Sequence, residues 1–183
     1  IWTIGHWLAY AVGVALGDGT GPLSVAKTGT GTLTLNGNNT FTGSTTISNG
    51  IVRMLIVSAL GNSGVGTTVN GGTLQLESIT SLAVAAEALH LGGSGYLGNG
   101  ALRSLSGTNS YAGVITLDSN AEIQTDTGTL SVNNVMGSGQ ILTVDDAGNT
   151  TVNGIISTGT GGLTKTGAGT LTLAEANTYT GVT

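Results

Sequence analysis

The sequence predicts an all-β protein that is built as a β-solenoid of about eight stacked coils. Three observations predict this class: the composition, a period-2 alternation of apolar and polar residues, and an internal repeat. Of the 183 residues, 33 are Gly and 31 are Thr. Each interior Gly costs a helix about 1 kcal/mol relative to Ala, whereas Thr is a good strand former. The composition therefore disfavours helices and favours many short strands with turns.

The charge and Cys content exclude several other classes. Charged residues make up 7% of the chain, against about 25% in typical soluble proteins, and there is one Pro, so neither a charged disordered chain nor collagen fits. The absence of Cys excludes disulfides, thiolate metal sites and Cys nucleophiles. The net charge is −5, and no nucleic-acid partner is expected because the cations are too few and too scattered. These cations are Lys27, Arg53, Arg103 and Lys165.

An internal repeat sets the length of the coils. Residues 27–45 read KTGTGTLTLNGNNTFTGST and residues 165–183 read KTGAGTLTLAEANTYTGVT, with 13 of 19 positions identical. A degenerate third copy, GNGALRSLSGTNSYAG, spans residues 98–113, so the copies are about 69 residues apart, or three coils of about 23. One such coil has too few inward apolar side chains to offset its ordering entropy, so the coils are expected to stack on one another.

Period-2 alternation predicts which side chains form the core. The tripeptide Gly-Thr-Leu occurs four times, and each time apolar and polar residues then alternate, as in a half-buried strand. The residues expected to face inward are Leu33, Leu35, Leu74, Leu76, Leu130, Val132, Leu171 and Leu173. Those expected to face outward are Thr32, Thr34, Thr170 and Thr172.

The three long-repeat copies share an Asn-x-aromatic-x-Gly pattern. Its aromatic residues are Phe41, Tyr111 and Tyr179, each preceded by an Asn (Asn39, Asn109, Asn177) and followed by a Gly (Gly43, Gly113, Gly181). Equivalent places in a repeat predict one shared role. We expect a corner at which the ring covers the coil edge and the Asn side chain bonds turn amides.

Several segments resemble a known repeat family. GTLTLNGNNTFTG, ALGNSGVGTTVNGGTLQL and GGLTKTGAGTLTLAEANTYTG are similar to the autotransporter-associated β-strand repeat, also called the passenger-associated transport repeat. The resemblance covers nearly all of residues 23–183. It implies a right-handed parallel β-helix that Gram-negative bacteria export to the outer-membrane surface or the extracellular space, usually within a longer chain.

The N-terminal residues do not resemble the repeat. We expect an apolar N-terminal cap or subunit-contact segment at residues 1–21 and a β-helix repeat domain at residues 22–183. The run IWTIGHWLAYAVGVAL is shorter than the ~20 residues of a membrane span, so no span is expected. It also lacks the Met and the basic start of a signal peptide, although a remnant of a targeting segment is an alternative.

No catalytic, cofactor-binding or metal site is predicted. Asp145 and Asp146 are adjacent, so their side chains should point to opposite faces of a strand, and the following turn composition suggests a solvated turn. His6 and His90 are the only His residues, no G-x-S-x-G elbow exists, and His90 is expected at the surface. The segment at residues 92–97, GGSGYL, lacks the Asp of calcium-binding β-rolls. Thr-x-Thr is missing from residues 80–124, which disfavours ice binding.

Two segments leave their local structure open. Residues 78–91, SITSLAVAAEALHL, include a fair helix former, but neighbouring strands and the Gly pair that follows favour another coil. Residues 51–60 are strongly apolar and form either a fully buried strand or a strand that contacts a partner.

These observations favour a non-enzymatic structural protein. The expected role is a rigid scaffold or an extracellular fibre subunit of a bacterial surface or secreted protein. The alternative is an adhesin, a binding module that recognises glycans or host surfaces, and an enzyme comes third. Residue 183 lies inside the repeat motif, which predicts an open edge, and the apolar residues 1–4 suit pairing with such an edge. We therefore expect head-to-tail self-association.

Overall fold

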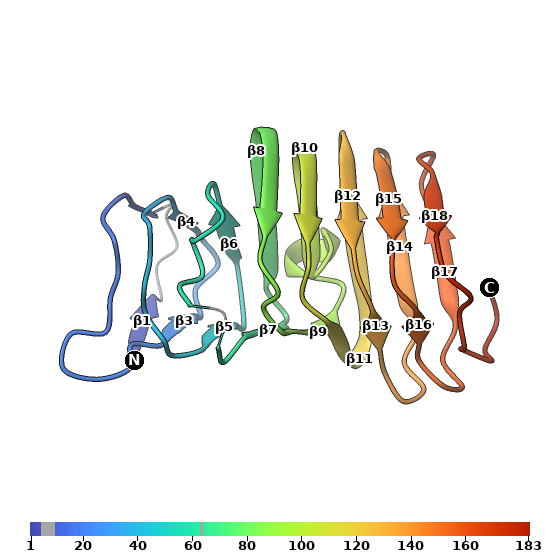
Figure 1. Cartoon of the computed structure of the whole chain (residues 1–183), viewed down its shortest axis with the longest axis horizontal. Coiled ribbons are helices and arrows are strands. Elements are labelled where there is room, and N and C mark those ends of the chain that lie inside the picture. Colours follow the sequence, from blue (N-terminus) through green and yellow to red (C-terminus); the bar gives the residue numbers. More distant parts are fainter. Residues whose placement is uncertain (5–9, 63) are drawn as a thin grey trace.

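A computed structural model describes residues 1–4, 10–62 and 64–183 as one parallel sheet of 18 strands, wound into a β-solenoid of about eight turns (Figure 1). The coils are stacked along the long axis of the molecule, with the two termini towards opposite ends. The predicted all-β solenoid is confirmed. Among the described residues, no helix has the length and hydropathy needed to cross a membrane. His6 lies outside the described residues.

The strands form three columns, and within a column each strand pairs in parallel with the strands of the neighbouring coils. The first column contains β1 (Trp2–Ile4), β3 (Val25–Lys27), β5 (Thr45–Ile47), β7 (Thr67–Asn70), β9 (Leu89–Gly93), the start of β11 (Ile115–Thr125), β13 (Val135–Met136) and β16 (Ile156–Ser157). The second contains β2 (Tyr10–Val12), β4 (Thr32–Leu35), β6 (Ile51–Met54), the starts of β8 (Thr73–Val84) and β10 (Leu102–Tyr111), the end of β11, β14 (Leu142–Asp146) and β17 (Leu163–Thr166). The third contains the ends of β8 and β10, β12 (Thr129–Val132), β15 (Asn149–Val152) and β18 (Leu171–Leu173).

The third column begins only at β8. In the earlier coils its place is taken by the segments 13–24, 36–44 and 55–66, whose described residues form no strand. Figure 1 shows the result as a step, because the coils from β8 onward rise higher than those before it. The one short helical segment in the described residues, the 3-10 turn Tyr96–Gly98, lies between β9 and β10.

The core runs through the inside of the coils as the alternation predicts. Leu33, Leu35, Leu74, Leu76, Leu130 and Val132 are buried, and Leu171 and Leu173 are partly buried. The last two belong to β18, which pairs on one edge only within the described residues, and their partial exposure is on this edge of the described sheet. Thr32, Thr34, Thr170 and Thr172 are partly or fully exposed, as predicted. Leu171 and Leu173 pack against the core as predicted, but they are less buried than the equivalent residues of the other strands.

The repeat period does not equal a whole number of coils. Six coils separate Leu33 of β4 from Lys165 of β17 in the second column, yet the sequence counterpart of Leu33 is Leu171, in the third column. Coil length varies: 19 residues separate Leu33 from its partner Val52, but 28 separate Leu74 from Leu102. The two best copies of the motif therefore lie on different faces of the solenoid.

Because of this shift, the three aromatic residues do not all lie at one shared corner, as had been predicted. Phe41 and Tyr111 each precede a first-column strand residue by four positions, and both are buried. Tyr179 is partly exposed and lies beside β16, because the Thr178 amide donates to the Ile156 carbonyl at 3.0 Å. The prediction is wrong for Tyr179, because its copy of the motif lies on the next face of the solenoid.

The glycine of the Asn-x-aromatic-x-Gly pattern does have one role in all three copies. A Cβ atom at Gly43, Gly113 or Gly181 would lie 2.4, 1.6 or 2.3 Å from a backbone oxygen of the preceding coil. Any side chain at these positions would push adjacent coils apart. Glycine therefore permits the close approach of consecutive coils at this point.

The N-terminal segment forms strands of the same sheet. Residues 1–4 and 10–12 lie within the predicted cap, and their strands β1 and β2 pair with β3 and β4 in the same way as later coils. Whether the segment acts as a cap or a subunit contact stays a prediction.

Strand was the correct choice for residues 78–91, which contribute the end of β8 and the start of β9. In residues 51–60 the strand is only β6, and the chain turns after Met54.

Candidate functional site

The adjacent acids Asp145 and Asp146 face opposite sides of β14, as predicted. Asp145 is partly exposed, whereas Asp146 is fully buried, so the interpretation of both as a solvated turn was wrong. Asp146 is accommodated because Thr150 donates a hydrogen bond of 2.8 Å to its carboxylate and Lys165 lies 4.0 Å from Oδ2. Burial raises the pKa of Asp146. These contacts lie at the turn between β14 and β15 of one coil, with Lys165 in the next coil, and they do not bring the carboxyl groups of Asp145 and Asp146 together on one face.

The other predicted positions are ordinary surface or turn residues. His90 is partly exposed between two buried Leu residues, and its Nδ1 lies 2.9 Å from Oδ1 of Asp118. Gly93 and Gly95 have positive φ angles of 81° and 79°, which only Gly adopts without strain. In the part of the chain that the structure describes, no three His, Cys, Asp or Glu residues are arranged to hold a metal ion.

The most unusual titratable group is Glu87, which the sequence reasoning missed. Glu87 lies in the turn between β8 and β9 and is only 4% exposed. Its Oε1 accepts a hydrogen bond of 2.6 Å from the Thr67 hydroxyl. Burial raises the pKa of Glu87 to about 7, against the lowering effect of that hydrogen bond. A single acid in the apolar run SLAVAAEALHL was the signal that could have identified it.

Tyr111 shares this environment. Its side chain is 1% exposed, and its hydroxyl has no hydrogen-bond partner among the described residues. Burial, followed by the charge of Glu87, raises the pKa of Tyr111, so its hydroxyl stays protonated. An unsatisfied buried hydroxyl and a buried carboxyl thus lie in the same part of the core, near the step at β8.

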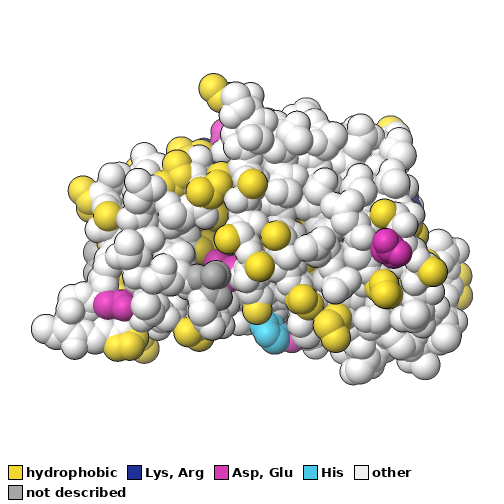
Figure 2. All heavy atoms as spheres, in the orientation of Figure 1, with side chains coloured by type: hydrophobic (Ala, Val, Ile, Leu, Met, Phe, Trp, Pro, Cys, Tyr) yellow, Lys and Arg dark blue, Asp and Glu magenta, His cyan; other side chains and the backbone are white. Residues whose placement is uncertain are grey.

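A hollow of about 280 Å³ lies against Glu87. Val57 and Asn62, from the segment between β6 and β7, form one wall, and Ala83 and Val84, at the end of β8, form the other. Val57 is 53% exposed, so the hollow is open to solvent. Figure 2 shows that the surrounding surface is mostly uncharged, with hydrophobic side chains in small groups.

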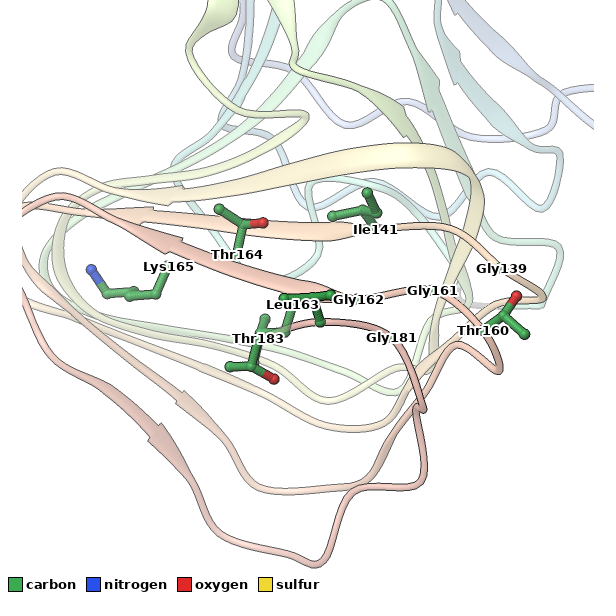
Figure 3. A pocket seen from close by; sticks show the side chains of 11 residues that line it. Gly139, Ile141, Thr160, Gly161, Gly162, Leu163, Thr164, Lys165, Gly181 and Thr183 are labelled. Atoms are coloured by element: carbon green, nitrogen blue, oxygen red, sulfur yellow. The ribbon is translucent and has the colours of Figure 1, made fainter.

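A second hollow, of about 470 Å³, lies at the last coil. In Figure 3, Leu163 and Thr183 lie next to each other within it and Lys165 stands to one side. Lys165 Nζ donates to the Gly167 carbonyl at 3.2 Å. Lys27 makes the equivalent contact with the Gly29 carbonyl and also reaches the Asn49 carbonyl of the next coil at 3.4 Å. Lys27 thus joins its coil to the following one, whereas Lys165 lies 4.0 Å from Asp146 of the preceding coil.

Comparison with known proteins supports the repeat interpretation. A family model described as the passenger-associated-transport-repeat matches residues 25–54, 54–76 and 163–183. Neither the curated proteins nor the solved structures gave a significant match. The matched segments coincide with strands β3 to β8 and with β17 and β18. The chain therefore contains passenger-associated transport repeats, as its sequence predicted.

Proposed function

We propose that this chain is a non-enzymatic, rod-like scaffold segment of a bacterial surface or secreted protein of the autotransporter passenger type. The observation that carries this proposal is the uninterrupted parallel pairing of one 18-stranded sheet around a continuous apolar core. With about 4.8 Å per coil, eight coils give a rod about 40 Å long. The passenger-associated transport repeats support export to the outer surface of a Gram-negative cell.

The scaffold extends by head-to-tail self-association. The last coil presents Leu171 and Leu173 only partly buried, a hollow against Leu163, and Lys165 without the inter-coil contact that Lys27 makes. Strands β17 and β18 each have one paired edge among the described strands. Such an edge is a template for another parallel strand. In a second copy, β2 is the second-column strand of the first coil, so it supplies a strand that can pair with β17.

Electron microscopy of the negatively stained chain tests this function. The proposal expects rods whose lengths are multiples of about 40 Å and increase with protein concentration. Single particles of constant size at every concentration would contradict self-association. Antibody labelling of intact bacterial cells tests export separately: signal that appears only after the cells are permeabilised would contradict a surface location.

A further inference from the structure

The step at β8 leaves part of a strand unpaired inside the solenoid. Residues 73–76 of β8 pair with β6 on one edge and with β10 on the other. Residues 81–84 pair with β10 only, among the described pairings. Their other edge faces the segment 55–62, which has no strand conformation. The end of β8 is therefore a free strand edge at which the third column begins.

The segment 55–62 does not satisfy this edge. Its backbone bonds lead back to the preceding coil, as in Asn62 N to Phe41 O at 2.9 Å and Asn39 N to Ser58 O at 3.3 Å. The Asn62 side chain also turns that way, towards the Thr40 carbonyl at 3.4 Å. No described backbone hydrogen bond joins residues 55–62 with residues 78–86. The hollow of about 280 Å³ occupies the space between the two segments.

The acid that lines the hollow indicates which kind of side chain would bind there. Glu87 lines it, and each Lys or Arg of the chain is engaged elsewhere. Arg53 lies 3.0 Å from Glu77, Arg103 pairs with Asp126, and the two lysines contact carbonyl groups or Asp146. Within the part of the chain that the structure describes, no cation pairs with Glu87, a buried acid in a chain of net charge −5. A partner's cation would complement it.

Apolar side chains lie on either side of the edge. Val57 is 53% exposed at the hollow, and Ile79, two residues before the free edge, is 99% exposed. An extended chain lying along residues 81–84 would cover both while its alternate side chains point into and away from the hollow.

We propose that residues 81–84 of β8 are a docking site for a basic extended peptide segment, which adds as a strand and places a Lys or Arg side chain in the hollow against Glu87. Main-chain hydrogen bonds supply binding at such an edge, and the side chain that enters the hollow supplies specificity. The partner is therefore an extended protein segment with one cation at the position that faces the hollow, and not a folded surface.

Fluorescence anisotropy with the intact chain tests this site. The probe is a labelled seven-residue peptide of alternating Thr and Val with a central Lys, and its controls carry a central Glu or N-methylated backbone amides. We expect saturable binding of the Lys peptide, and at least about tenfold weaker binding of both controls, because they lack the ion pair or the strand hydrogen bonds.

Two variants distinguish peptide binding at the hollow from general electrostatic attraction to the protein. Glu87→Gln should weaken binding of the Lys peptide about tenfold or more, while retaining the oxygen that accepts from Thr67. Glu77→Gln removes an acid of β8 that lies against Arg53, outside the hollow, and should leave the affinity unchanged. Equal loss in both variants, equal binding of the Lys and Glu peptides, or no saturable binding would overturn the proposal. Butylamine that competes as well as the peptide would show a small-cation site and would overturn strand addition.

Discussion

Thr67 of β7 donates a hydrogen bond of 2.6 Å to the carboxyl group of Glu87, one coil further along the chain. This bond favours the ionised form of Glu87, but burial outweighs it and raises the pKa to about 7. Glu87, bonded to Thr67, therefore holds a proton below about pH 7 and is ionised above it. The pair joins two consecutive coils at the place where the third column starts.

This relationship predicts how stability depends on pH. Because the folded pKa of Glu87 is raised from 4.5 to about 7, the folded state keeps a proton that the unfolded state loses in this range. The Glu87 contribution is fully present below pH ~4.5 and is lost as the pH rises to about 7, a decrease of roughly 3 kcal/mol in the free energy of unfolding. Chemical melts from pH 4 to 8 should show a smaller decrease in Glu87→Gln, and identical pH profiles would contradict the assignment.

A glycine at the same corner predicts a large steric effect. A Cβ at Gly113 would lie 1.6 Å from the Glu87 carbonyl oxygen, so Gly113→Ala should destabilise the fold by about 1–3 kcal/mol or more. Gly21→Ala is a matched control, because no heavy atom lies within 4 Å of its added Cβ and its φ is not positive. Its effect should stay within about 0.5 kcal/mol. Equal thermal midpoints of the two variants would show that the coils can separate at Gly113 without cost.

The burial of the core side chains predicts that a Leu→Ala substitution lowers the free energy of unfolding more in the middle of the solenoid than in the last coil. Leu74→Ala should cost about 2–5 kcal/mol, since Leu74 is fully buried and its strand pairs on both edges. Leu171→Ala should cost less, because Leu171 is only partly buried in the last strand. Urea melts of the two variants measure both losses. A larger loss for Leu171 would mean that another chain covers the last coil under the conditions of the melt.

Asparagine side chains hold consecutive coils together through backbone groups. Asn39 is 3% exposed, accepts from the Leu16 amide at 2.8 Å and donates to the Ala59 carbonyl at 2.6 Å, so it links three coils. Asn39→Ala should therefore cost about 1–3 kcal/mol, because two backbone groups lose their partner. The neighbouring Asn38 is exposed and bonds only the Ser58 side chain among the described contacts, so Asn38→Ala should be nearly neutral. Similar unfolding midpoints for the two variants would exclude the inter-coil role.

The fold could be predicted from the sequence because strand alternation is local. Leu33 and Leu35 face inward for the same reason in any coil, and the Gly that follows the aromatic residue marks each close approach. The face that a repeat occupies was not predictable in this way. It depends on the summed length of all preceding coils: the three coils from Leu33 to Leu102 span 69 residues, which equals the repeat period, whereas the three from Leu102 to Lys165 span only 63, so the last copy lies one face later. The site at Glu87 was missed because it requires two distant segments, the 55–62 loop and the end of β8, to lie side by side.

Sedimentation velocity tests the central claim, which is that the scaffold grows by stacking on the last coil. Leu173→Glu places a charge on the inward side of β18, whereas the control Thr172→Glu places it on the exposed outward side of the same strand. Circular dichroism first confirms that both variants are folded. Stacking predicts sedimentation coefficients that increase with concentration for the unmodified chain and for Thr172→Glu, but a constant monomer value for Leu173→Glu. A monodisperse monomer for the unmodified chain at high concentration, or association of Leu173→Glu as strong as that of the control, would contradict the claim.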